Sequence, residues 1–186
     1  MKVNSIRGTI LEDRELFLEE EGEKYYKTYI IIEEQKIPLV ASMFVLRDKK
    51  GKCDVTCIVK QEPGRKHRFV YLYAATITSC DESLPDINKF NIGGHVVKVY
   101  PPTFVGSMAS ELLITKIAWR SGKGTNIINI RALGQSARRL SDVKLNQVLN
   151  CTCYIQMFND NIDFYILKSR RRNVLEKRGN KKNGSS

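Results

Sequence analysis

Aromatic and basic side chains that lie close together are the residues of this chain best suited to chemistry. Trp119 is the one tryptophan among the 186 residues, and Arg120 follows it directly, with Lys123 three positions further on. An exposed aromatic ring can stack on a nucleobase, and a neighbouring cation can neutralise a phosphate. This group therefore predicts contact with a nucleic-acid strand. Packing of Trp119 in the core is the alternative.

A second basic group directly follows the turn signal Pro63-Gly64. Arg65, Lys66, His67 and Arg68 are consecutive and sit between two expected strands. Such a cluster predicts a phosphate-binding loop, and a solvated hairpin tip is the alternative.

Other candidate binding residues are expected on strands or in loops. Tyr71 and Tyr73 share one strand face with Phe69, and these rings either stack on bases or belong to the core. Phe104 follows Pro101-Pro102 in an expected loop, and Arg131 is a further basic candidate on a strand.

The residues give little support to an enzyme. The two histidines, His67 and His95, are far apart, and Gly122-Lys123-Gly124-Thr125 lacks the glycine that a phosphate loop needs at position 117, where Ile117 stands. Two cysteine pairs occur at a strand period of two and are expected to be core sulfurs rather than zinc ligands: Cys53 and Cys57, Cys151 and Cys153. We expect no catalytic residue, no metal and no cofactor.

Charge is unevenly distributed along the chain, whose net charge is +11. Most of the excess lies in residues 168–186, which predicts attraction to polyanions such as nucleic acid, or else a solubilising tail. Residues 12–23 are instead rich in Glu and Asp, which would repel phosphate. That stretch is expected to face away from nucleic acid, to meet a basic partner, or simply to be a solvated hairpin loop.

The longest apolar runs are too short to span a bilayer, and no apolar run follows the N-terminus. The five cysteines, an odd number without a secretion signal, indicate reduced thiols. We expect a cytoplasmic, nucleoid-associated protein with no membrane partner.

The dominant hydrophobic period is two, which predicts an all-β protein. Five strands are expected in the first half and five in the second, with helices at 43–48 and 135–149. The strands are expected at 3–10, 25–33, 36–41, 53–61, 68–78, 91–100, 111–120, 126–133, 150–158 and 163–168. The halves align at 6–10 with 92–96 and at 55–59 with 151–155, as a duplicated domain would.

Strand-strand-strand-helix-strand-strand is the element order of the OB-fold, a five-stranded barrel that often binds oligonucleotides. The chain thus predicts two tandem OB-fold units, at 1–80 and 89–169. A linker at 81–88 joins them, and a basic, disordered tail at 170–186 follows.

Residues 115–119 and 126–137 resemble bacterial single-stranded DNA-binding proteins, in which a basic-aromatic strand precedes a strand, a turn and a helix. The opening strand at 94–97 is also similar, and the first half matches best at 6–10 and 68–75. Some members of that family carry two OB units per chain and dimerise, which implies a homodimer here. Cellular members usually end in an acidic tail, whereas this chain ends basic. That departure fits a phage, plasmid or mobile-element variant, or a PriB-like primosomal factor.

The combined expectation is a non-enzymatic protein that binds single-stranded DNA without sequence preference in replication, recombination or repair. The second unit is expected to dominate binding, and replication proteins are possible partners. One alternative is an RNA-binding OB protein. Another is a protein-interaction scaffold, which predicts a buried Trp119 and a basic tail that holds an acidic partner.

Overall fold

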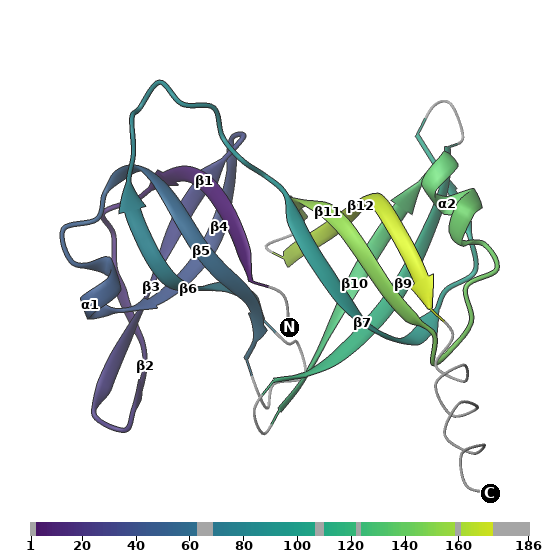
Figure 1. Cartoon of the computed structure of the whole chain (residues 1–186), viewed down its shortest axis with the longest axis horizontal. Helices are drawn as coiled ribbons and strands as arrows, with labels where there is room; N and C mark the ends of the chain where they lie inside the picture. Colours follow the sequence, from purple (N-terminus) through teal and green to yellow (C-terminus); the bar gives the residue numbers. More distant parts are fainter. Residues whose placement is uncertain (1–2, 63–68, 107–109, 122–123, 159–160, 173–186) are drawn as a thin grey trace, which may run out of the picture.

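The computed structural model describes residues 3–62, 69–106, 110–121, 124–158 and 161–172 (Figure 1). Two β-barrels lie side by side, and α1 and α2 mark opposite ends of the molecule. Among the described residues, no helix is long and apolar enough to cross a membrane.

Barrel 1 is a six-stranded sheet of order β1-β5-β6-β4-β3-β2 that closes through an additional β1–β3 pairing. Its elements are β1 (Asn4–Ile10), β2 (Glu15–Glu20), β3 (Glu23–Ile32), β4 (Gln35–Ser42), α1 (Met43–Leu46), β5 (Gly51–Gln61) and β6 (Val70–Ser79).

Barrel 2 has the order β10-β12-β11-β7-β9-β8 and closes through β10–β9. Its elements are β7 (Phe90–Val99), β8 (Thr103–Val105), β9 (Ser110–Ser121), β10 (Gly124–Leu133), α2 (Gln135–Leu140), β11 (Val148–Phe158) and β12 (Asn161–Arg172).

The two barrels repeat one topology. In each, a single parallel pairing joins the third and fifth barrel strands: β4 with β6, and β10 with β12. The pairings of β1 with β5 and of β7 with β11 are equivalent as well. The predicted fold, two tandem five-stranded OB barrels each with a helix between its third and fourth strands, is confirmed.

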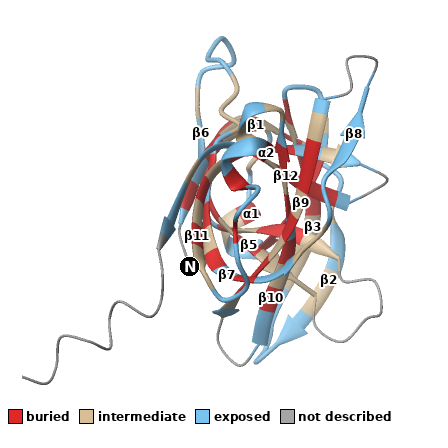
Figure 2. Cartoon of the chain, turned by 90° about the vertical axis from the view of Figure 1, so that its right-hand side faces the viewer, coloured by how far each residue is buried: buried red, intermediate tan, exposed pale blue. Residues whose placement is uncertain are grey.

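Strand alternation places one set of side chains inside each barrel, where Figure 2 shows the buried residues. The inner set is mainly Ile, Leu and Val. It also contains the four predicted core cysteines, all of which are buried and free. Burial raises the pKa of the Cys57 thiol to about 12.

The helix predicted at 135–149 is wrong beyond its first six residues. Its apolar spacing does bury Ala137, Leu140 and Val143, but the helix ends at Leu140. From Val148 the chain is a strand that pairs with β7, opposite His95. Between these two elements, residues 141–147 form turns, although their apolar residues continued the helical spacing.

Other elements differ in extent from their predictions. The sequence did not predict β2 or β8. The predicted strand 163–168 runs as far as Arg172, so the first residues of the expected basic tail belong to β12. The remainder of that tail lies outside the described residues.

Amide side chains join the barrels by bonding to backbone groups. The Gln61 side chain donates to the Ile127 carbonyl and accepts from the Ile127 N–H, each at 3.0 Å. Asn88, just before β7, makes the same pair of bonds with Ile155 of barrel 2, at 2.9 and 2.7 Å, and its amide also donates to the Glu33 carboxylate of barrel 1 at 3.0 Å. Two further bonds of this kind run from Asn91 N–H to Asn4 and from Met157 N–H to Gln35. These bonds satisfy backbone groups that would otherwise be unpaired at the junction.

Candidate nucleic-acid interface

Lysines and aromatic rings gather on the outside of barrel 1. Cross-strand pairing places Lys27 of β3 beside Val40 of β4, Tyr73 of β6 and Ile58 of β5 in one row. Inner residues alternate with this row, so its members point away from the core. We call the outward set the lysine–aromatic face; it consists of Lys27, Tyr29, Lys36, Lys60, Phe69 and Tyr73.

Each lysine of this face lies over an aromatic ring. Lys60 Nζ is 3.6 Å from the centroid of Tyr73, and Lys36 Nζ is 4.4 Å from that of Tyr29. Lys27 Nζ is 5.3 Å from both Tyr29 and Phe69. The rings are half-buried, so part of each is open to solvent. Ring faces and ammonium groups are the two parts that a single-strand site needs.

The lysine that lies nearest to a ring has a perturbed charge. Burial lowers the pKa of Lys60 below the ordinary lysine value, and the negative charge of Glu20 partly opposes this effect. Lys60 thus loses its proton at a lower pH than an exposed lysine does. Glu20 belongs to β2, so the hairpin formed by β2 and the start of β3, which carries Glu15, Glu19, Glu20 and Glu23, borders the lysine–aromatic face.

The two tyrosines singled out in β6 have different surroundings. Tyr73 is half-buried, with Lys60 over one side and Tyr25 at 5.9 Å between ring centroids. Tyr71 is only 5% exposed, because Phe17 of β2 packs edge-on against it at 5.2 Å. Burial, rather than a neighbouring charge, is the main cause that raises the pKa of Tyr71 to about 12. Of the two, only Tyr73 can offer a ring to a base.

The predicted basic loop, Arg65, Lys66, His67 and Arg68, lies outside the described residues. Its base is described: the Glu62 N–H donates to the Phe69 carbonyl at 2.9 Å. Phe69 itself stacks on Tyr71 at 6.1 Å. The described residues that flank this loop, Glu62 and Phe69, are therefore paired with each other, and Phe69 belongs to the lysine–aromatic face.

Barrel 2 has a smaller outer cluster around Tyr100, which follows β7. Lys98 Nζ is 4.6 Å and Lys116 Nζ 5.7 Å from the Tyr100 centroid. A hydrogen bond to Lys116, aided by the charge of both lysines, lowers the pKa of the Tyr100 hydroxyl. This cluster combines the same two groups, a ring and cations.

Arg131 of β10 corresponds to Val40 of β4, which lies in the same cross-strand row as Lys27. It lies beside Tyr165 of β12, as Val40 lies beside Tyr73 in barrel 1. Its Nε is 2.8 Å from the buried Asp163 carboxylate, and its guanidinium is 5.5 Å from the centroid of Phe158. Burial raises the pKa of Asp163, although the Arg131 charge opposes this. Arg131 is therefore already paired with an anion.

Trp119 lies on the inner side of β9. It pairs with the buried Asn126 of β10, packs against the core cluster, and has a buried indole N–H without a hydrogen-bond partner among the described residues. This position suits packing better than base stacking. Arg120 is exposed beside it, and Lys123 lies outside the described residues. Phe104 is 70% exposed on β8.

The sequence analysis missed the lysines that cover the rings and the rings of Tyr29 and Tyr100. Lys27 and Tyr29, and likewise Lys98 and Tyr100, are two positions apart, which is the spacing of neighbours on one strand face. That spacing could have identified both pairs. The structure also places more lysine–ring contacts on barrel 1, whereas the sequence pointed to the second unit.

Among the described residues, no three His, Cys, Asp or Glu side chains are grouped as metal ligands.

Comparison with solved structures identifies similar molecules. The chain superposes on the wild-type single-stranded DNA-binding protein from Thermus aquaticus with a TM-score of 0.72 and 13% identity, covering 92% of each chain. A deletion mutant of that protein gives a TM-score of 0.75 at 12% identity, covering 91% of this chain and 93% of the other. No family model and no curated protein matches the sequence. The chain therefore has, over almost its whole length, the two-barrel OB fold of the Thermus aquaticus single-stranded DNA-binding protein.

Proposed function

We propose that this protein binds single-stranded DNA without sequence preference and is not an enzyme. One observation carries the proposal: three lysines lie over half-buried aromatic rings on the outer face of an OB barrel. The rings would stack on bases, and the lysines would turn to the phosphates. Because every base has a π-face, such a surface binds any sequence.

The energies favour replacing the lysine–ring contacts by base–ring and lysine–phosphate contacts. A lysine over an exposed ring contributes about 0.5–1 kcal/mol, whereas a stacked base contributes about 1–3 kcal/mol. The lysine then gains a phosphate partner and releases a counterion from the strand. A bound strand would therefore replace weaker contacts within the protein by stronger ones.

The similar Thermus aquaticus proteins are described as single-stranded DNA-binding, which supports the proposal. A role in replication, recombination or repair, replication proteins as partners, and a homodimer of this two-barrel chain are further parts of it. Trp119 is half-buried against the core cluster, which meets only in part the buried position that the scaffold alternative expects. The outward lysines and rings of barrel 1 are what favour strand binding instead.

The test is equilibrium binding of the full chain to labelled strands of matched sequence. Single-stranded DNA, single-stranded RNA and double-stranded DNA are compared by fluorescence anisotropy at several salt concentrations. We expect the tightest binding to single-stranded DNA of any sequence, with affinity falling as salt rises. Equal or tighter RNA binding would favour the RNA alternative, and no binding to any strand would refute the proposal. Sedimentation of the free chain tests the homodimer.

A further inference from the structure

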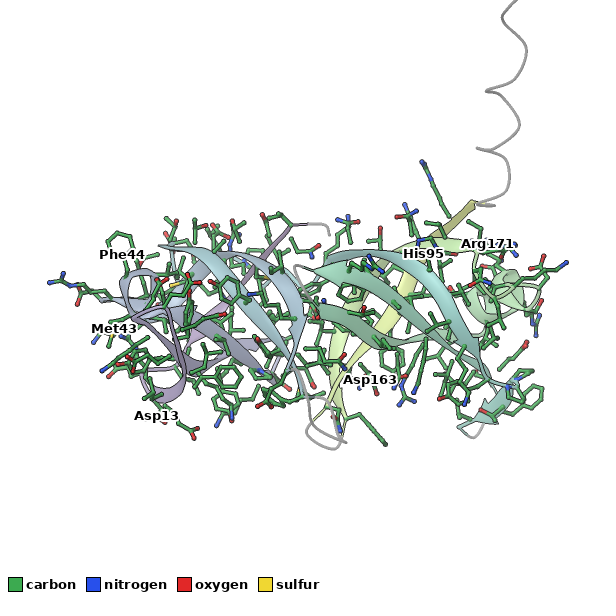
Figure 3. The ribbon with its side chains drawn as sticks, turned by 90° about the horizontal axis from the view of Figure 1, so that it is seen from below. Asp13, Met43, Phe44, His95, Asp163 and Arg171 are labelled. Carbon is green, nitrogen blue, oxygen red and sulfur yellow. The ribbon has the colours of Figure 1, made fainter. Side chains whose placement is uncertain are left out.

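A polar groove on barrel 2 is separate from the surfaces described above. It has a volume of about 520 Å³ and lies between α2 and the strands β7, β11 and β12. In Figure 3, Arg171 at the end of β12 lies on one side of barrel 2, and Asp163, the partner of Arg131, lies on the other. The groove is lined by Arg139 of α2 and by Lys168 and Arg170 of β12, and its lining includes neither Arg131, Asp163 nor Phe158.

Three cations line the groove: Arg139 from α2, and Lys168 and Arg170 from β12. All three are exposed, and among the described residues none is paired with a carboxylate. Arg171 instead pairs with Asp142 and donates to the Arg139 carbonyl at 3.1 Å, which ties α2 to the end of β12. The groove thus has a fixed wall and unneutralised positive charge.

The remaining lining residues supply hydrogen-bond donors. The Thr152 hydroxyl donates to the side-chain oxygen Oδ1 of Asn91 at 3.1 Å, which leaves the side-chain N–H groups of Asn91 for a ligand. A Cβ atom added at Gly93 would lie 2.4 Å from the side-chain oxygen Oδ1 of Asn150, so that oxygen lies against the sheet at Gly93. The Asn150 amide N–H groups are then the atoms left to face the groove.

The chemistry of this lining selects a ligand. Cations and amide N–H groups bind phosphate oxygens, and the lining contains neither a carboxylate to repel them nor an aromatic ring to stack on a base. An acidic peptide would also need apolar anchors, and the apolar residues of the lining are few: Cys151 and Ile166, which are buried, and Leu167. A sugar–phosphate backbone fits this lining better.

We propose that the groove is a second nucleic-acid site, which holds the phosphate backbone of a strand whose bases are bound elsewhere on the protein. The inference rests on the proposed function. A long strand would pass from the stacking surfaces around barrel 2 into the groove. A short strand would occupy the stacking surfaces alone.

The test compares two strand lengths on the full chain. One OB fold covers about 4–16 nucleotides, so oligo-thymidines of about 8 and about 40 nucleotides represent partial and complete coverage of two barrels. The groove variant carries Arg139→Ala, Lys168→Ala and Arg170→Ala. Its control carries Arg47→Ala, Lys49→Ala and Lys50→Ala, which remove the same charge at the α1 end of barrel 1.

We expect the groove variant to bind the long strand about tenfold more weakly at low salt, with a salt slope smaller by about 2 for three lost phosphate contacts. Binding of the short strand should stay within about twofold of the unmodified protein. Gly93→Ala, which pushes the Asn150 amide into the groove without changing charge, should also weaken only the long strand.

Different results separate the two proposals. If the unmodified chain binds neither strand, the proposed function fails. If it binds both, and the groove variant matches the control on both, only the groove proposal fails. A groove variant with a lower sedimentation mass would make the groove a contact between copies. Groove-dependent binding of poly-glutamate with no change in strand binding would assign it to an acidic protein. Either result overturns the proposal.

Discussion

At the residue scale, Tyr71 and Tyr73 differ in exposure although they share a strand face. Phe17 covers Tyr71, whereas Tyr73 has only Lys60 and Tyr25 beside it. We predict that Tyr73→Leu weakens strand binding by about 1–3 kcal/mol, the energy of one stacked base. The matched control Tyr71→Leu should change affinity by less than about twofold, since only a ring open to solvent can stack on a base. Anisotropy titrations measure both, and equal losses would contradict the assignment.

Lys60 allows a test by pH. Burial lowers its pKa, so Lys60 loses its positive charge at a lower pH than the exposed lysines. Loss of a cation weakens phosphate binding, and affinity should therefore fall as the pH rises toward 10. Lys60→Arg keeps its charge throughout this range. We predict a flatter pH profile for the arginine variant; identical profiles would show that Lys60 does not contact the strand.

Strand parity explains which single residues could be predicted from the sequence. Cys53 and Cys57 lie two positions from Val55, and Cys151 and Cys153 lie four and two positions from Ile155, so each cysteine shares a strand face with a buried residue. The predicted burial of the four cysteines is confirmed. Trp119 has the parity opposite to Lys116 and Arg120, so the same argument would have placed its ring inside. The basic neighbours of Trp119 suggested binding, but neighbours along a strand point to opposite faces.

At the scale of elements, the β2 hairpin both covers Tyr71 and brings negative charge to the lysine–aromatic face. We predict that Glu19→Gln with Glu20→Gln tightens strand binding severalfold at low salt, because repulsion of phosphate is removed. The gain should vanish at about 1 M salt, where charges are screened within about 3 Å.

The control for this prediction removes two acidic charges elsewhere. Asp13→Asn with Asp48→Asn acts at the α1 end of barrel 1; Figure 3 shows Asp13 at the same end of the molecule as Met43 and Phe44 of α1. Equal tightening by the control would assign the effect to net charge rather than to the hairpin.

Most strands could be predicted, because one buried face imposes a period of two that is visible without any contact information. Elements that depend on pairing with another strand were harder to predict from the sequence. All three residues of the short β8 are exposed, and among the described strands it pairs with β9 alone, so it carries no hydrophobic alternation. The segment after Leu140 met the helical spacing by chance: residues 141–147 form turns, and the strand that pairs with β7 begins at Val148.

At the scale of the whole molecule, the junction decides whether the barrels act together. Asn88 satisfies both backbone groups of Ile155. We predict that Asn88→Ala lowers the free energy of unfolding by about 1–3 kcal/mol, the cost of leaving such groups unpaired. Urea denaturation measures this loss, and the exposed neighbour Gln156→Ala should change stability by less than about 0.5 kcal/mol. A neutral Asn88→Ala would mean that the bonds do not hold the barrels.

The tandem architecture was predictable from the internal repeat, but the junction was not. Its bonds join residues more than sixty positions apart through Asn and Gln side chains, which carry no periodic signal. The binding surface was likewise only partly predictable, because the lysine–aromatic face combines side chains from four strands.

The most direct test of the account is photo-cross-linking of the full chain to a bromodeoxyuridine strand, with the linked residues identified by mass spectrometry. We predict cross-links at the half-buried, outward rings of the lysine–aromatic face, Tyr29, Phe69 and Tyr73, and at Tyr100 in barrel 2. We predict none at Trp119, which lies on the inner side of β9, or at the buried Tyr71. Saturable binding with cross-links confined to Trp119 and Phe104, or to residues outside these faces, would contradict the central claim.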